Sequence, residues 1–156
     1  MSSNFHHLVR GIITDGEKVL AARAIGHKNT FLPGGHVEFG ESAPIALQRE
    51  IEEELGLSCR IEGYLGLVEH QWLKNNELHC EINQAFKVIV PELDVSRNPP
   101  SRESHIEFIW VSVNELENYR LQPFPFRKLI PQLVNGDRSV WWESTLNLEI
   151  DAENIG

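Results

Sequence analysis

Residues 34–57 read GGHVEFGESAPIALQREIEEELGL, and this stretch carries the strongest structural signal in the chain. Ser42 belongs to the residue types that favour the position just before a helix, and Pro44 is tolerated in a first helical turn. Gly56 is the residue type that most often follows a helix, because it adopts left-handed backbone conformations without strain. Together the three positions predict a helix of about 13 residues between Ser42 and Gly56.

The predicted helix has an apolar side and an acidic side. Its apolar residues recur at four-residue spacing, which is typical of a helix that packs on a sheet, at Leu47, Ile51 and Leu55. Successive helical side chains are about 100° apart, so Glu50, Glu53 and Glu54 fall within an arc of about 100° beside that stripe. Such a helix packs one side against a core and presents three carboxylates to a cleft.

An acidic run of this kind has two interpretations. Taken alone, Glu52, Glu53 and Glu54 are typical of a solvated helix face, since like charges at helical spacing cost only a few tenths of a kcal/mol each. The same carboxylates suit Mg²⁺, which takes one or two carboxylates together with water and phosphate oxygens. The cluster is compatible with a metal site, and the choice depends on its surroundings.

Segments outside the helix are typical of β-strands, either because they are rich in branched apolar residues, as at 7–13, or because polar and apolar residues alternate, as at 60–69 and 78–90. Four such segments occupy 7–13, 18–24, 60–69 and 78–90. Asp15-Gly16 predicts a turn that folds the first two segments into a hairpin, and the polar tip 74–77 joins the other two. Pro33 and the two glycines after it predict irregular backbone before the helix.

The second half of the chain adds a strand and two helices. After a proline-containing loop at 91–102, we expect a strand at 106–113, a short helix at 115–119 capped by Asn114, and a helix at 126–134. Trp141 and Trp142 indicate that the remaining tail packs against the rest of the chain. This order of strands and helices predicts a mixed α/β or α+β fold in one domain over residues 1–156.

Composition disfavours several classes of protein. The formal net charge of −9 is unlike that of proteins that coat nucleic acids, although divalent cations allow an acidic protein to bind a phosphate-rich ligand. No apolar run approaches the roughly 20 residues that cross a membrane, and the start of the chain lacks the pattern of a secretory signal. Cys59 and Cys80 predict two buried thiols in the reducing cytoplasm. We therefore expect a cytoplasmic protein whose partner is a small molecule rather than nucleic acid or a membrane.

The surroundings of the acidic helix resemble the Nudix hydrolase family. Residues 35–57 match every fixed position of the Nudix box, namely Gly35, Glu41, Arg49, Glu50, Ile51, Glu53, Glu54, Gly56 and Leu57. The flanking strands, the Pro33-Gly34 lead-in and the segment 107–110 are also similar to this family. The resemblance implies an α/β/α sandwich with a mixed sheet, in which the box forms a loop, a helix and a second loop.

The same resemblance implies a hydrolase of the MutT-like branch, which cleaves a phosphoanhydride bond of a nucleoside di- or triphosphate with Mg²⁺ or Mn²⁺ as cofactor. The implied metal ligands are the carbonyl of Gly35 and the carboxylates of Glu50, Glu53 and Glu54. Metal ions would screen the phosphates and lower the pKa of the attacking water. The general base is either one of these glutamates, with Glu50 preferred, or a residue outside the box.

Residues around the metal ligands are expected to support them. Arg49 is expected to pair with a box glutamate, Glu41 being preferred, because a guanidinium fork orients carboxylates well; an ordinary surface ion pair is the alternative. Glu103, or else Glu107, is the candidate for a further acidic ligand, and a solvated loop carboxylate is equally compatible with the sequence.

Phe31, His36 and Trp72 are the candidates for contact with the nucleotide substrate. His36 lies within the box near the expected phosphates, and either aromatic residue could stack on a base, although core packing is the commoner use of an aromatic side chain. Alternative substrates are ADP-ribose, a nucleotide sugar and capped RNA, and a non-catalytic nucleotide-sensing module is an alternative function. The sequence leaves a monomer and a homodimer equally open.

Overall fold

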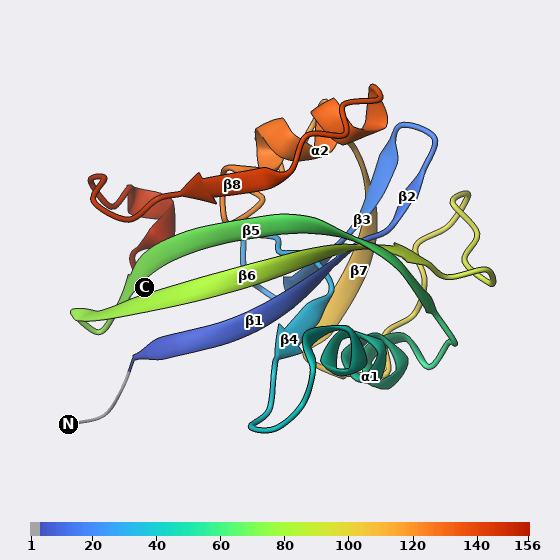
Figure 1. Cartoon of the computed structure of the whole chain (residues 1–156), viewed down its shortest axis with the longest axis horizontal. Helices are drawn as coiled ribbons and strands as arrows, with labels where there is room; N and C mark the ends of the chain where they lie inside the picture. Colours follow the sequence, from blue (N-terminus) through green and yellow to red (C-terminus); the bar gives the residue numbers. More distant parts are fainter. Residues whose placement is uncertain (1–3) are drawn as a thin grey trace.

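Two β-sheets lie between two α-helices in the computed structural model, which describes residues 4–156 (Figure 1). The strands are β1 (Phe5–Ile12), β2 (Thr14–Asp15), β3 (Lys18–Ala24), β4 (Gly34–His36), β5 (Arg60–Lys74), β6 (Glu77–Ile89), β7 (Ile106–Ser112) and β8 (Trp141–Ser144). The helices are α1 (Ala43–Leu55) and α2 (Phe126–Val134), and a short 3-10 helix, η1, spans Ala152–Asn154. Residues 1–3 of the predicted domain lie outside the described part of the chain.

The larger sheet has five strands in the order β4-β1-β6-β5-β8. It is mixed, because β1 runs parallel to β6 and β5 parallel to β8, whereas the β1–β4 and β5–β6 pairs are antiparallel. The smaller sheet, in the order β2-β3-β7, is antiparallel. The mixed sheet and the two helices confirm the predicted fold class, and the smaller sheet adds a layer that sequence reasoning did not separate from the larger one.

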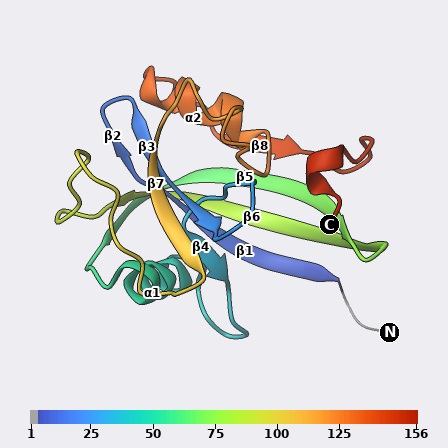
Figure 2. The same cartoon turned by 180° about the vertical axis from the view of Figure 1, so that it is seen from behind.

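Both faces of strand β3 are buried, which explains how the helices cover the sheets from opposite sides. Val19 and Ala21 belong to the hydrophobic cluster that includes the buried face of α2, and Leu20 and Ala22 belong to the cluster that includes the buried face of α1. Successive side chains of a strand point to opposite faces, so each face of β3 contacts one cluster. The view from behind also shows α1 and α2 on opposite sides of the strands (Figure 2).

Helix α1 confirms the predicted helix between Ser42 and Gly56, and the backbone at its two ends shows why. Ser42 is extended, and its carbonyl accepts the first helical hydrogen bond, from the Ala46 amide at 2.9 Å, although its side chain makes no capping bond. Gly56 has a φ of 69°, in the left-handed region that favours glycine, and donates its amide to the Glu52 carbonyl at 2.8 Å. The predicted apolar stripe is buried against β1 and β4.

The pairing predicted for the first two strands is wrong. Strand β1 pairs with β4 and β6, whereas β3 pairs with β7 along its whole length and with only the two residues of β2. The chain passes from one sheet to the other at Ile13, whose carbonyl accepts the Leu20 amide at 2.9 Å. Ile12 and Ile13 lie in different hydrophobic clusters, so the crossing buries both side chains.

The helix predicted at 115–119 is also wrong, because this segment forms a series of turns. The Tyr119 amide donates to the Glu115 carbonyl at 3.1 Å, as in an α-helix, but the Arg120 amide donates only three residues back, to Glu117, at 2.9 Å. Arg120 then adopts a left-handed φ of 51°, which ends the turn and directs Leu121 into the core. Burial of Leu121 therefore outweighs local helix propensity.

Strand β5 extends to Lys74 and not only to the predicted residue 69. It forms a long hairpin with β6, and the tip residues Asn75 and Asn76 have φ values of 52° and 64°. Two consecutive positive φ angles are what a tight primed hairpin turn requires, and asparagine tolerates them better than most residues. The predicted polar tip is therefore confirmed. The last five residues of β5 are mostly polar, which is why the sequence pattern did not reveal the full length of this strand.

The tail packs as predicted through Trp141, which is 4% exposed, whereas Trp142 is 65% exposed. Strand β8 adds to the edge of β5 in parallel, and the alternation of side chains along a strand sends the two tryptophans to opposite faces. The Trp141 ring contacts Phe126 of α2, with 6.0 Å between ring centroids. The tail thus completes the core under α2.

The structure bears on the predicted burial of the two thiols and on the prediction that no segment crosses a membrane. Cys59 and Cys80 are free thiols, half-buried rather than buried as predicted. Burial raises the pKa of Cys59 to about 11, so this thiol is protonated at neutral pH. Within residues 4–156, no helix has both the length and the apolar character needed to cross a membrane.

We expect Trp141→Ala to lower the free energy of unfolding by about 3–5 kcal/mol, because it removes a large aromatic side chain from the core. Trp142→Ala is the matched control, with an expected change within about 0.5 kcal/mol for an exposed side chain. Urea titration of both variants measures the difference. Equal losses in the two variants would contradict this packing of the tail.

Candidate functional site

Helix α1 turns two of its predicted site carboxylates inward and one outward. Glu54 is only 5% exposed, and the Glu50 side chain is 19% exposed. The Glu53 side chain is 53% exposed, with its Oε2 3.5 Å from Nη1 of Arg49. The arc of three acids predicted from the sequence therefore has an inner pair and an outer member.

Glu54 is the most unusual ionisable group of the site. Burial raises the pKa of its carboxyl to about 8, against the opposing effects of the Arg10 charge and the Gly34 amide. Its Oε2 is buried and has no hydrogen-bond partner among residues 4–156. A buried carboxyl oxygen without a partner costs free energy, so this atom is a place where a cation or proton donor would be stabilised.

The Glu50 carboxylate lies against the backbone of Gly35. A Cβ added to Gly35 would lie 2.6 Å from the carboxyl carbon of Glu50 and within 2.8 Å of both its oxygens, closer than such atoms approach. Burial raises the pKa of Glu50, and the neighbouring Arg49 opposes that shift. Glycine at this position therefore leaves room for the Glu50 carboxylate beside the main chain, and a larger residue would displace that carboxylate.

Gly34, one residue earlier, is fixed by strand pairing. The segment Gly34–His36 forms β4, where irregular backbone was predicted, and pairs with β1 between Leu8 and Arg10. Gly34 has a φ of 144°, and an added Cβ would lie 1.9 Å from the Val9 carbonyl oxygen. Glycine at this position lets β4 close onto β1, which brings Gly35 against α1.

Arg49 orients the carboxylates around it, and its predicted pairing with Glu41 is present. Its guanidinium donates two hydrogen bonds to Glu41, from Nε at 2.8 Å and from Nη2 at 3.0 Å, and one to Glu50 from Nη1 at 3.0 Å. Nη2 also donates to the carbonyl of His36 at 3.2 Å. The Arg49 bonds, with the Glu38 amide, lower the pKa of Glu41 to about 2. The two bonds to Glu41 use Nε and Nη2 of Arg49, which leaves Nη1 to hold Glu50.

The inner pair of carboxylates fits a divalent cation. Glu50 and Glu54 offer hard oxygen donors, one of them unpartnered, and the glycine backbone at Gly35 leaves room beside them. Within residues 4–156, no three acidic, histidine or cysteine side chains converge as a complete ligand set. Mg²⁺ does not need one, because it commonly binds one or two carboxylates and completes its shell with water and phosphate oxygens.

Glu103 and Glu107, the two candidates for a further acidic metal ligand, differ in whether they are near the site. The loop before β7 is attached to the end of α1, because the Arg102 amide donates to the Glu54 carbonyl at 2.8 Å. The negative charge of Glu103 contributes to the raised pKa of Glu54, which places it within electrostatic reach of the inner pair. Glu107 instead pairs with Arg23 at 2.8 Å. Of the two candidates, Glu103 is the one near the site.

A cavity of about 680 Å³ has Arg10 in its wall. The charge of Arg10 opposes the raised pKa values of Glu50 and Glu54, so it lies close to both. The cavity is also lined by Phe31 and Trp72, two of the residues predicted to contact the substrate. A volume of this size is in the usual range for small-molecule sites.

His36, the third substrate candidate, is not among the residues that line this cavity. It lies at the sheet edge, with Nε2 3.1 Å from Nδ1 of His6, and His6 in turn contacts His79 at 2.9 Å. The His79 ring stacks on Trp72, with 4.0 Å between centroids. The group therefore supports one face of Trp72 from outside the cavity.

Sequence reasoning missed a polar network that joins two cavity-lining residues, Arg10 and Glu81, through the fully buried Asn83. The Trp72 indole donates to Glu81 at 2.7 Å, and Asn83 donates to Glu81 at 2.6 Å and accepts from Arg10 at 3.3 Å. Arg10 also donates to the Leu32 carbonyl at 2.9 Å. Arg10 was detectable in principle, because it is a charged residue directly between the buried residues Val9 and Gly11 of β1. Such a charge requires a partner or a ligand.

Comparison with known proteins is consistent with this geometry. A model of the NUDIX domain family matches residues 5–133. The chain is similar to the solution structure of the Escherichia coli ORF135 protein, at 24% identity and a TM-score of 0.63, covering 88% of this chain and 96% of that one. A MutT protein from Methanosarcina mazei Go1 gives 21% identity and a TM-score of 0.67, covering 89% and 99%. A UDP-X diphosphatase gives 21% and 0.61, covering 92% and 68%.

In protein freed of divalent cations with EDTA, we expect Glu54 to make stability depend on pH. Its pKa is raised from 4.5 to about 8 in the folded state, so its contribution is present below about pH 4.5 and is lost as pH rises through about 8. Glu54→Gln cannot ionise, so above about pH 8 it should unfold less readily than wild type. The gap should reach a few kcal/mol, since each pKa unit is worth about 1.4 kcal/mol.

Urea titrations from about pH 5 to about pH 9 measure this gap. Glu52→Gln, on the exposed side of α1, is the control and should follow the wild-type curve. Parallel curves for wild type and Glu54→Gln would show that Glu54 is not the buried acid described above.

Proposed function

This chain belongs to the NUDIX domain family, and we propose that it is a Mg²⁺-dependent hydrolase that cleaves a phosphoanhydride bond of a nucleoside di- or triphosphate. Members of the family are hydrolases that act on pyrophosphate bonds. Mn²⁺ is the alternative cofactor. The proposal assigns the inner carboxylates to the cation and the adjoining cavity to the organic part of the substrate.

One observation carries the proposal: within residues 4–156 the buried Oε2 of Glu54 has no hydrogen-bond partner, and this carboxyl lies close to Glu50 and to Arg10, which lines a cavity of small-molecule size. A core carboxylate that served only the fold would be expected to find a protein partner. A site for a cation explains the missing partner, and the cavity explains why a ligand reaches the cation.

The residues of this chain divide the work of hydrolysis among them. When bound, the divalent ion screens the phosphate charge and lowers the pKa of water for in-line attack. Glu50, Glu54 and the Gly35 carbonyl hold that ion in our proposal, with Glu53 as an outer ligand and Glu103 as a further one. Glu50 is also the preferred proton acceptor, because burial already raises its pKa. Arg49, itself fixed by Glu41, keeps the Glu50 carboxylate in place.

The cavity sets the orientation of the substrate. Arg10 lines the cavity and lies close to both carboxylates, so its positive charge is placed to stabilise a phosphate group there. The base then points toward Phe31 and Trp72, whose rings offer surfaces for stacking. The likeness to a UDP-X diphosphatase favours nucleoside-diphosphate-linked compounds as a second class of substrate, with the same bond cleaved.

A substrate panel tests the function directly. We expect release of nucleoside monophosphate with phosphate or pyrophosphate from nucleoside di- or triphosphates, in the presence of Mg²⁺ or Mn²⁺ and not with EDTA. ADP-ribose, UDP-glucose and a capped RNA oligonucleotide are included as alternatives. Calorimetric binding of nucleotides without any product would instead identify a non-catalytic sensing module.

Glu53→Gln and Glu54→Gln test the assigned roles. Each removes a charged oxygen ligand while keeping the size of the side chain, so kcat should fall by about 100-fold or more. Circular dichroism should report an unchanged fold. Glu52→Gln, one residue away on the exposed side of the same helix, should retain wild-type kcat. Wild-type turnover in both site variants would contradict the assignment.

A further inference from the structure

One wall of the cavity comes from a part of the chain beyond the family match. Residues 152–156, which we call the tail wall, line the cavity, whereas the match ends at residue 133. The tail wall is attached to the β5–β6 hairpin, because the Gly156 amide donates to the Leu73 carbonyl at 2.8 Å and the Asn75 amide donates to the Gly156 carbonyl at 3.2 Å. Leu73 directly follows Trp72, so the tail wall joins the strand that carries this cavity-lining aromatic residue.

Strand register places the tail wall far from the end of the cavity that Arg10 lines. Arg10 lies opposite Ala85 of β6, and Ala85 lies opposite Gly66 of β5. Ile155 of the tail wall instead pairs with Leu73 of β5. From Gly66 to Leu73 a strand extends roughly 20 Å. Because both ends line the same cavity, a substrate whose phosphates lie near Arg10 directs its organic part along the sheet toward the tail wall.

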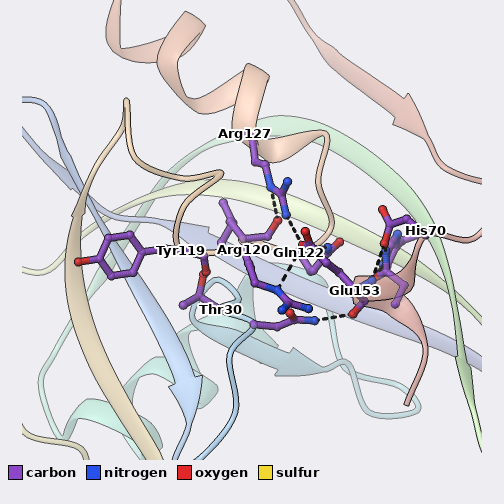
Figure 3. Close-up of polar contacts among 11 residues, drawn as sticks. Thr30, His70, Tyr119, Arg120, Gln122, Arg127 and Glu153 are labelled. Carbon is purple, nitrogen blue, oxygen red and sulfur yellow. Dashed lines mark hydrogen bonds and ion pairs between the residues drawn. The ribbon is translucent and has the colours of Figure 1, made fainter.

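Glu153 ties the tail wall to the segment before α2 and to α2 itself (Figure 3). Its Oε1 accepts hydrogen bonds from Arg127 at 2.8 Å and from the amide nitrogen of Gln122 at 3.1 Å, and lies 3.6 Å from Nε of Arg120. Its main-chain carbonyl accepts a bond from the amide nitrogen of Asn29 at 2.7 Å. One carboxylate oxygen therefore gathers three side chains from another part of the chain.

The Glu153 carboxyl is ionised at neutral pH. Burial raises its pKa, but the hydrogen bond from Arg127 and the positive charges of Arg127 and Arg120 outweigh burial and hold the pKa below its ordinary value. Hydrogen bonds between two charged groups are stronger than those between neutral ones. The Glu153–Arg127 pair is therefore a strong attachment between the tail wall and α2.

The next residue, Asn154, is held from the sheet. Its Oδ1 lies 3.1 Å from Nε2 of His70 of β5, and its Nδ2 donates to Asp151 at 3.0 Å. His70 is 3% exposed, and its Nδ1 lies 2.9 Å from Oγ1 of Thr145. Asn154 thus attaches the tail wall to β5, whereas Glu153 attaches it to the segment on the other side of the cavity.

Arg127 reaches Glu153 from outside the cavity. It belongs to α2, its side chain is 19% exposed, and it is not among the described residues that line the cavity. Its Nε also donates to the Leu121 carbonyl at 2.9 Å, which fixes the guanidinium against the core. A substitution of Arg127 can therefore change substrate binding only through the tail wall or through the fold.

We infer that the tail wall determines affinity for the base of a nucleotide and that Glu153 is its positioning residue. With the Glu153–Arg127 pair formed, the tail wall is held against the segment 120–122, and the cavity keeps its shape at the end where the base lies. Without the pair, the wall stays on β5 but parts from that segment, so affinity for the base falls. The inference rests on the proposed function, which places the phosphates at Arg10.

Glu153→Ala and Arg127→Met each break the pair from one side. We expect either variant to raise KM for the preferred nucleoside triphosphate by at least about fivefold while kcat stays within about twofold, since a loss of uniform binding raises KM alone. The double variant should raise KM no further than Glu153→Ala, because both substitutions act through one contact.

A neighbouring ion pair supplies matched controls. Lys128 of α2 contacts Glu143 of β8 at 2.6 Å, and the Glu143 side chain is 34% exposed, as is that of Glu153. Neither Lys128 nor Glu143 lines the cavity. Glu143→Ala and Lys128→Met should therefore retain the wild-type KM and kcat. A tail wall that served stability alone would lower the free energy of unfolding in Glu153→Ala, measured by urea titration, without a change in KM.

Calorimetry tests the same inference without turnover. The ligands are AMP, CMP, GMP and UMP, each compared with ribose 5-phosphate, which lacks only the base. Wild type should bind the preferred monophosphate at least about tenfold more tightly than ribose 5-phosphate, and Glu153→Ala should reduce that ratio to about threefold or less. Glu143→Ala should keep the wild-type ratio.

A wild-type KM in both Glu153→Ala and Arg127→Met would overturn the inference, and so would equal binding of ribose 5-phosphate and every monophosphate to wild type. A matching rise of KM in both control variants would also overturn it, because the loss would not be specific to the tail wall. Continued nucleotide hydrolysis in these cases would leave the proposed function intact. If wild type hydrolyses no nucleotide, the proposed function fails, and a ratio that falls in Glu153→Ala still supports the tail wall.

Discussion

The burial of the Glu54 carboxyl is the constraint around which this structure is organised. It lies on the last turn of a helix whose neighbouring face packs into the core, so the acid is carried inward with the apolar stripe. Gly34 lets β4 close onto β1, Gly35 leaves space for Glu50, and Arg49 holds Glu50 by bonding Glu41. Together these features hold the Glu50 and Glu54 carboxylates close to Arg10, which lines the cavity.

Local patterns predicted what depends on local physics. The bounds of α1 follow from Ser42 and Gly56, and the hairpin tip follows from asparagines that tolerate positive φ. The errors occur where tertiary contacts decide: Ile12 and Ile13 enter different cores and separate the first hairpin, and burial of Leu121 replaces a helix with turns. No window of sequence contains those contacts, because the partners lie far along the chain.

The candidate site divides in the same way. Residues Gly35, Glu41, Arg49, Glu50, Glu53 and Glu54 belong to one contiguous motif, so their chemistry could be anticipated, including the bond between Arg49 and Glu41. The cavity is assembled from six separate parts of the chain, and Asn29, Gln122 and Glu153 are ordinary surface residue types when taken one at a time. The hydrogen bonds of Asn29 and Gln122 to Glu153 bring the three residues together, and the sequence does not show these bonds. His36 shows the converse, since position within a motif did not bring it into the cavity.

The position of β8 has a consequence for dissecting the protein. In the sheet order β4-β1-β6-β5-β8, this four-residue strand pairs with Gly66–Glu69 on the outer side of the 15-residue β5, and Ile155 adds a single bridge at Leu73. A chain trimmed at residue 133 would leave that strand as a long open border with unpaired amides and carbonyls, and would uncover the apolar surface beneath Trp141. An exposed strand edge of this kind pairs readily with strands of other molecules. The trimmed protein would self-associate, so the boundary suggested by shared ancestry is not the boundary of a stable folding unit.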